Sequence, residues 1–151
     1  MPLILLAGQD MSLLATRAAV LAELGAIVKS GACRFIDQLL REERIDLLVL
    51  CHTLPLAERE SLIATARETS PAAEILQLVS TVELREMRLL PGVKIGFCQP
   101  ARLVRQVEEL LAQSSQARPP QEHESACWRS HQDWPHRKVT SGTLLDAAVE
   151  R

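Results

Sequence analysis

The sequence lacks any strong excess of charge of one sign. Its 151 residues include 17 Lys and Arg against 19 Asp and Glu, which gives a formal net charge of -2 at pH 7. Unspecific binding to nucleic acid or to an anionic membrane surface needs a clear excess of positive charge. We therefore expect neither nucleic acid nor membrane among the partners of this protein.

Long apolar runs are also missing. The first ten residues, MPLILLAGQD, contain an apolar run of only about six residues, with no basic leader before it and no small-residue cleavage pattern after it. Such a run is too short for a signal peptide or a membrane span. We expect a cytoplasmic protein.

Paired cysteines are the third absence. The four cysteines, Cys33, Cys51, Cys98 and Cys127, are widely and irregularly spaced, which argues against a disulfide framework and against a CxxC redox or zinc pair. Thiols stay reduced in the cytosol, so we expect no bridge between Cys51 and Cys98.

Five short apolar segments alternate with helical patterns along the first three quarters of the chain. Two of them, Leu3–Ala7 and Asp46–Cys51, are nearly uninterrupted aliphatic runs, typical of strands buried on both faces of a parallel sheet. Strands are expected over residues 3–7, 26–29, 46–51, 74–79 and 94–97. The alternation predicts an α/β fold with a doubly wound five-stranded parallel sheet in the order 2-1-3-4-5, of the flavodoxin-like type.

Apolar residues recur at helical spacing between these strands, and turn residues mark where the helices end. Gly25 suits a left-handed stop after the first helix, and Ser70-Pro71 ends the third. Helices are expected around residues 13–24, 35–40, 62–66, 81–90 and 103–111.

The chain changes character at about Gln113, where it becomes polar and proline-interrupted. We therefore divide it into a domain over residues 1–112 and a linker and largely disordered tail over 113–151, with a short terminal helix starting near Thr143. His123, Cys127 and His131 are spaced four apart and would share one helical face. Their spacing matches no strong metal signature, so a solvated tail is favoured over a zinc site, and we expect no metal and no cofactor.

Four motifs link this pattern to a known family. They are ILLAGQD at the first strand, IDLLVLCHTLP at the third, EILQLVS at the fourth and GVKIGFCQP before the fifth helix. With the order of the elements, they resemble the receiver domain of bacterial two-component response regulators over roughly residues 3 to 112.

The resemblance implies a phosphoacceptor pocket in which the working residues are replaced. The family has an acidic pair after the first strand that holds magnesium, and this chain has Gly8 and Gln9 there, with Asp10 at best a partial substitute. The phosphoacceptor aspartate corresponds to Cys51.

Three further positions also depart from the family. The hydroxyl residue at the end of the fourth strand corresponds to Val79, although Ser80 lies next to it, and the lysine before proline corresponds to Gln99. The aromatic residue that changes position on activation corresponds to Gly96. We call these positions the degenerate site: Gly8, Gln9, Asp10, Cys51, Val79, Ser80 and Gln99.

Phosphoryl transfer depends on positioning and on neutralising charge, so this set of replacements removes each electrostatic part of the reaction. We predict a pseudo-receiver that is not an enzyme and acts in signal transduction through protein–protein contacts without phosphorylation. The expected partner is a histidine kinase or another signalling protein.

In the receiver family the fourth helix, fifth strand and fifth helix form the usual partner and dimer face. The resemblance makes the same region the expected contact surface here, including a homodimer, with a merely solvated charged surface as the alternative. The residues singled out on it are Val82, Arg85, Met87, Arg102 and Arg105.

Cys51 carries the alternative function, a thiol-based redox sensor. Free cysteine is among the most buried residue types, so packing as a small apolar residue is favoured. His52 follows it directly, but successive side chains in a strand point to opposite faces, which argues against a Cys51–His52 pair. A small-molecule binder is the weakest alternative, because no glycine-rich phosphate loop occurs.

Overall fold

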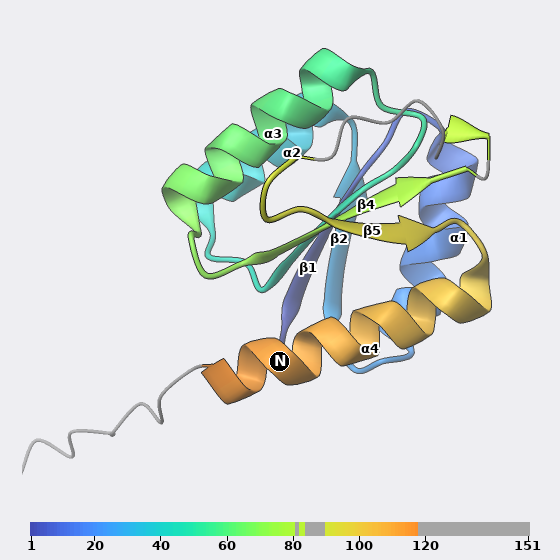
Figure 1. Cartoon of the computed structure of the whole chain (residues 1–151), viewed down its shortest axis with the longest axis vertical. Coiled ribbons are helices and arrows are strands. Elements are labelled where there is room, and N and C mark those ends of the chain that lie inside the picture. Colours follow the sequence, from blue (N-terminus) through green and yellow to red (C-terminus); the bar gives the residue numbers. More distant parts are fainter. Residues whose placement is uncertain (81, 84–89, 118–151) are drawn as a thin grey trace, which may run out of the picture. The chain divides into compact units, whose positions relative to one another are not determined.

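Five parallel strands form a single sheet in the order β2-β1-β3-β4-β5 (Figure 1). The computed structural model describes residues 1–80, 82–83 and 90–117. The strands are β1 (Leu3–Ala7), β2 (Ile27–Gly31), β3 (Leu47–Leu50), β4 (Glu74–Val79) and β5 (Lys94–Phe97). The predicted fold class and strand order are confirmed.

The predicted bounds of three strands agree with the structure, and those of β2 and β3 differ slightly. β2 begins at Ile27 rather than Ala26 and continues to Gly31, while β3 is one residue shorter at each end than the predicted run. The backbone around β3 still pairs beyond these bounds, since Cys51 N donates to Ala7 O over 2.8 Å. Such shifts at strand ends are ordinary.

Four helices of the described chain cover the two faces of the sheet. They are α1 (Met11–Ala22), α2 (Cys33–Glu42), α3 (Leu56–Thr69) and α4 (Pro100–Ala117). Helices α2 and α3 lie on one face, and α1 and α4 lie on the other (Figure 1). The polar helix predicted over 81–90 lies largely outside the described residues, so α4 is the predicted fifth helix. The tail from residue 118 onward also lies outside them.

The sheet separates two apolar cores, and β1 shows how the sequence supplies both. Ile4 and Leu6 pack toward α1 and α4, whereas Leu5 and Ala7 pack toward α2 and α3. All four are fully buried, as expected of a central strand whose successive side chains alternate between two covered faces. Burying one such leucine contributes about 1.5–3 kcal/mol, so the centre of the sheet is the rigid base of any site at its edge.

Two residues set the ends of α1. Asp10 is the N-cap, and its Oδ1 accepts a hydrogen bond from Leu13 N over 3.0 Å, which satisfies a backbone donor that has no partner within the helix. Gly25 follows the helix with a φ of 72°, a left-handed conformation that glycine adopts without strain. Gly25 thus has the predicted left-handed conformation, but α1 itself ends at Ala22, earlier than the predicted stop.

Helix α4 continues past the change of character at Gln113 and ends at Ala117. The hydroxyls of Ser114 and Ser115 donate to the carbonyls of Leu110 and Leu111 over 3.0 and 2.9 Å, so polar side chains are accommodated along the helix itself. None of the described helices is long and apolar enough to cross a membrane.

Candidate functional site

The degenerate site begins where β1 and β3 end, at the point where the strand order reverses. In doubly wound sheets this is where ligands bind. Gly8 follows β1 and Cys51 follows β3, and a Cβ atom built on Gly8 would lie 3.1 Å from the Cβ of Cys51. The structure therefore brings these two predicted site residues into direct contact.

The space beside Gly8 is already filled by Leu14 of α1. A Cβ atom on Gly8 would lie 3.0 Å from Leu14 Cδ2, closer than side chains ordinarily approach, and Leu14 itself is buried. A side chain at this position would require Leu14 and Cys51 to shift by a few tenths of an ångström. Apolar side chains therefore pack directly against Gly8.

The next two residues hold the loop in place. Gln9 is exposed, and its backbone N donates to Thr53 Oγ1 over 3.1 Å. The Asp10 carboxylate is also exposed, and one of its oxygens serves as the cap of α1. No group of three or more His, Cys, Asp or Glu side chains within residues 1–80, 82–83 and 90–117 is arranged to hold a metal ion.

Cys51 lies in the core with 1% of its surface exposed. Burial raises the pKa of its thiol; Arg17 and, more weakly, Arg59 act to lower this pKa, and Cys98 acts to raise it. A reactive thiol needs an accessible setting that lowers its pKa. The surroundings of Cys51 favour the packing hypothesis and give no support to the redox alternative.

Arg17 is the residue of this site that sequence reasoning missed. It lies in α1 between Leu14 and Leu21 on the buried stripe of the helix, with 5% of its surface exposed. Its Nη1 has no hydrogen-bond partner in the part of the chain that the structure describes. The sequence did contain a signal for its burial, because Arg17 lies three residues after Leu14 and four before Leu21, on the apolar side of the helix.

Arg59 of α3 is the second buried arginine near Cys51. Its Nε donates to Leu54 O and its Nη2 to His52 O, each over 2.7 Å, and Nη2 lies 3.8 Å from Glu83 Oε1. These contacts tie down the loop between β3 and α3. Arg59 is therefore well partnered, in contrast to Nη1 of Arg17.

Among the predicted site residues Val79, Ser80 and Gln99 there is no lysine, and the one hydroxyl is bonded to Glu83. Val79 is buried, and Ser80 donates both its backbone N and its hydroxyl to Glu83 Oε2, over 3.1 and 3.3 Å. Gln99 is exposed, and its carbonyl accepts from Leu103 N at the start of α4. The amide of Gln99 carries no charge that a phosphoryl group would need.

His52 contacts the other nearby cysteine. Its Nδ1 lies 3.2 Å from Sγ of Cys98, and this thiol also lies 3.4 Å from the carbonyl O of Val79. Both side chains are partly buried. The sequence predicted that His52 does not pair with Cys51, and in the structure His52 contacts Cys98.

The expected partner face is described in part. Arg102 lies over the ring of Phe97, 5.0 Å from its centroid, and Arg105 Nε pairs with Glu109 over 3.2 Å. Val82 is 81% exposed, while Arg85 and Met87 lie outside the described residues.

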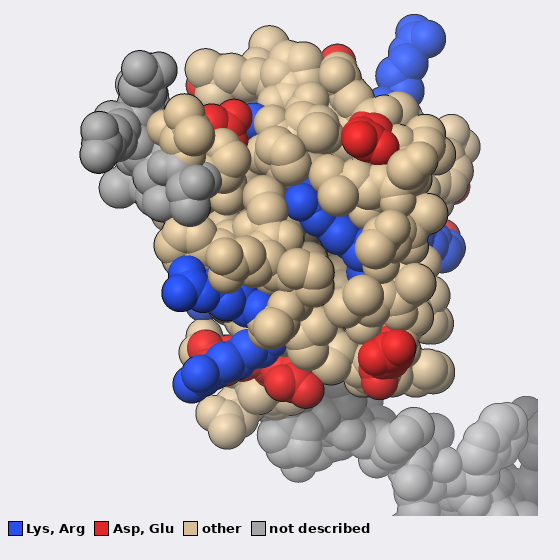
Figure 2. All heavy atoms as spheres, turned by 90° about the vertical axis from the view of Figure 1, so that its right-hand side faces the viewer, with Lys and Arg blue, Asp and Glu red and all other residues tan. Residues whose placement is uncertain are grey.

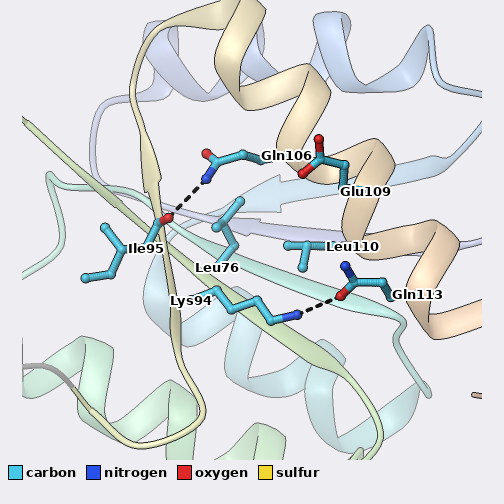
Figure 3. A pocket seen from close by; sticks show the side chains of 7 residues that line it. All are labelled: Leu76, Lys94, Ile95, Gln106, Glu109, Leu110 and Gln113. Carbon is cyan, nitrogen blue, oxygen red and sulfur yellow. Dashed lines mark hydrogen bonds between the residues drawn. The ribbon is translucent and has the colours of Figure 1, made fainter.

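Beside this face, a shallow cavity of about 280 Å³ lies between β5 and α4, lined by seven residues (Figure 3). Gln106 reaches across it to β5, where its amide donates to Ile95 O over 3.1 Å and accepts from Phe97 N over 3.3 Å. A Cβ atom on Gly96 would lie 2.7 Å from Gln106 Oε1. The amide thus occupies space next to the position of the family's mobile aromatic residue.

Charged side chains are dispersed on the face drawn in Figure 2. Lys and Arg side chains and Asp and Glu side chains occur there in small separate groups within a largely uncharged surface. Several of the described charges pair locally, such as Lys94 with Glu74 over 3.3 Å. On that face, neither sign forms a broad patch of the kind that attracts a polyion.

Comparison with models of protein families gives no match, and neither does comparison with curated proteins. Solved structures do match. A response regulator receiver protein from Sinorhizobium medicae has a TM-score of 0.63 at 22% identity, over 75% of this chain and 96% of that one. A CheY-like receiver domain protein from Methanospirillum hungatei has a TM-score of 0.61 at 18% identity, over 77% and 98%.

A structure described as adenylate cyclase from Rhodopirellula baltica also matches, with a TM-score of 0.63 at 20% identity, over 76% of this chain and 90% of that one. At these identities the likeness concerns the fold. The described part of the chain has the fold of a response regulator receiver domain.

Proposed function

We propose that this protein is a pseudo-receiver, which acts in two-component signal transduction by binding proteins and not by accepting a phosphoryl group. The observation that carries the proposal is the packing of Leu14 and Cys51 against Gly8, within 3.0 and 3.1 Å of where a Cβ atom would stand. Glycine offers magnesium no oxygen ligand, and a carboxylate side chain at this position would be crowded by apolar atoms. On this account the protein has no enzymatic activity and works in the cytoplasm.

The charge balance around Cys51 supports the proposal. Receiver chemistry needs carboxylates that hold a cation, but the groups around Cys51 include two arginines, Arg17 and Arg59. A divalent cation would be repelled by these guanidinium groups, and the Asp10 carboxylate already caps α1.

The partner would be a histidine kinase or another signalling protein, bound through β5 and α4, with a homodimer through the same region. Arg102 and Arg105 are exposed on α4, and Arg102 stacked on Phe97 forms a partly apolar, positively charged contact point. The redox alternative has no observation in its favour, since Cys51 is buried and its pKa is raised.

Incubation with acetyl phosphate and magnesium, followed by intact-mass spectrometry, tests the loss of phosphorylation. The wild-type mass should not change, and neither should that of Cys51→Asp, because restoring the acceptor alone leaves Gly8 and Gln9 unable to hold the metal. A receiver domain known to be phosphorylated by acetyl phosphate serves as the positive control. A phosphoryl adduct on the wild-type chain would end the proposal.

The contact surface is tested by affinity capture from the native cell with the full chain as bait. The variant Arg102→Ala/Arg105→Ala should lose bound signalling proteins. Arg34→Ala is the matched control, because Arg34 is also exposed but belongs to α2 on the opposite face of the sheet. Equal losses in the two variants would argue against this face.

A further inference from the structure

We propose that Arg17 binds a small oxyanion, such as inorganic phosphate, reversibly and without magnesium at the degenerate site. The inference rests on the proposed function, because it concerns the same site without its phosphoacceptor. The proposed ligand is an anion, whereas the carboxylates of the receiver family hold a magnesium cation.

The first observation is that the guanidinium of Arg17 is buried and that one of its nitrogen atoms has no hydrogen-bond partner among the described residues. Arg17 is 5% exposed, and its Nη1 has no hydrogen-bond partner among the described residues. Its guanidinium faces the Cys51 thiol, which is a weak hydrogen-bonding group. Removing a guanidinium from water without a counter-charge is costly, and buried arginines are normally paired. An anionic ligand would supply the missing partner.

The second observation is the sign of the charges nearby. Gly8, Gln9 and Cys51 replace three family carboxylates, and Arg17 and Arg59 both act on the Cys51 thiol. Arg59 has Glu83 3.8 Å away, but no ion pair within 4.0 Å involves Arg17 in the described part of the chain. The uncompensated positive charge is therefore at Arg17.

The hydrogen-bond donors near the site indicate the kind of anion. A guanidinium presents parallel N–H donors that match the spacing of two oxygens in a phosphate or carboxylate. Thr53 stands at the same edge, where its Oγ1 accepts from Gln9 N over 3.1 Å, so its hydroxyl proton can still be donated to a ligand.

The experiment titrates the full wild-type chain with inorganic phosphate in the absence of magnesium, against sodium chloride at matched ionic strength. Melting temperature and amide chemical shifts of a ¹⁵N-labelled sample are recorded. At a phosphate concentration 100 times the dissociation constant we expect the melting temperature to rise by about 5–11 °C. The amides of Gly8, Cys51 and Thr53 should shift and reach saturation. A phosphomonoester is titrated in parallel to separate free phosphate from a phosphorylated metabolite.

Two variants make the assignment specific. Arg17→Met should abolish the response to phosphate and raise the baseline melting temperature, because it removes a buried charge with little change in volume. Arg105→Met is the matched control, since Arg105 is exposed on α4, and it should respond like the wild type.

Several outcomes would overturn the proposal. They are a response no larger than that to chloride, an undiminished response in Arg17→Met, and wild-type shifts confined to α4. If Arg17→Met does not fold, the wild-type shifts decide the question alone. Binding that reverses on dialysis supports the proposal, whereas a covalent phosphoryl adduct would count against the proposed function as well.

Discussion

The packing of Leu14 against Gly8 can be measured by a double-mutant cycle. In Gly8→Ala the added methyl group would lie 3.0 Å from Leu14 Cδ2 and 3.1 Å from Cys51 Cβ. Forcing an extra methyl group into a packed core costs about 1–3 kcal/mol. Positive φ angles occur among the described glycines at Gly25 and Gly92, so backbone strain adds nothing at Gly8.

Leu14→Ala removes a side chain that is 1% exposed and should cost about 2–5 kcal/mol. In the double variant the new methyl group enters the space that Leu14 has left. We therefore expect the combined loss of unfolding free energy to be smaller than the sum of the single losses by about 1–2 kcal/mol. The assay is equilibrium urea denaturation of the full-length chain, followed by far-ultraviolet circular dichroism.

The control for this cycle is Gly25→Ala. Gly25 has a φ of 72° and no atom within 4 Å of its Cβ position, so its substitution should cost about 1–2 kcal/mol through backbone strain and should add to Leu14→Ala without coupling. The reasoning is refuted if Gly8→Ala is neutral or stabilising, or if its effect is the same with and without Leu14.

Three further predictions concern the caps, the thiols and the acid dependence. Asp10→Ala should lower the unfolding free energy by about 1 kcal/mol, because the N-cap of α1 is lost. Asp10→Asn should retain most of this free energy, since asparagine also caps helices. Equal losses for the two variants in urea denaturation would show that Asp10 does not act as a cap. Under native conditions a maleimide reagent should label Cys98, which is partly exposed, before Cys51, which should react only on denaturation; peptide mapping that finds Cys51 first would restore the redox alternative. The pKa of Asp37 is lowered, first by the hydrogen bond from Arg41, so its contribution to stability is present at neutral pH and disappears as pH falls through the folded-state pKa. Asp37→Asn should therefore destabilise the protein at pH 7 and have a smaller effect near pH 3, and a pH-independent difference in denaturation midpoints would contradict this.

The fold was predictable because its signals are local and repeat along the chain. The aliphatic runs of β1 and β3, Gly25 after α1 and Pro71 after α3 each act within a few residues. The places of Gly8, Cys51 and Val79 at the carboxyl ends of β1, β3 and β4 were also predictable, because a motif marks the end of each strand. Helix α4 continues to Ala117, later than predicted, and the hydroxyls of Ser114 and Ser115 donate to carbonyls of their own helix.

The contacts inside the site could not be predicted in the same way. That Leu14 fills the space at Gly8 depends on how α1 packs over the sheet, and no spacing in the sequence reports that distance. The burial of Arg17 was readable from its place on the apolar stripe of α1, but an arginine there is ordinarily expected to extend its charge into water. The contact of His52 with Cys98 joins residues 46 positions apart, beyond the reach of any local pattern.

The most direct test of the central claim is ¹⁹F NMR of the protein with beryllofluoride, with and without magnesium. A receiver that can hold a phosphoryl group forms a magnesium-dependent beryllofluoride complex at its phosphoacceptor. With Cys51 in place of the carboxylate and Leu14 against Gly8, this protein should give only resonances that are the same in both samples. A bound resonance that appears only when magnesium is added would contradict the account.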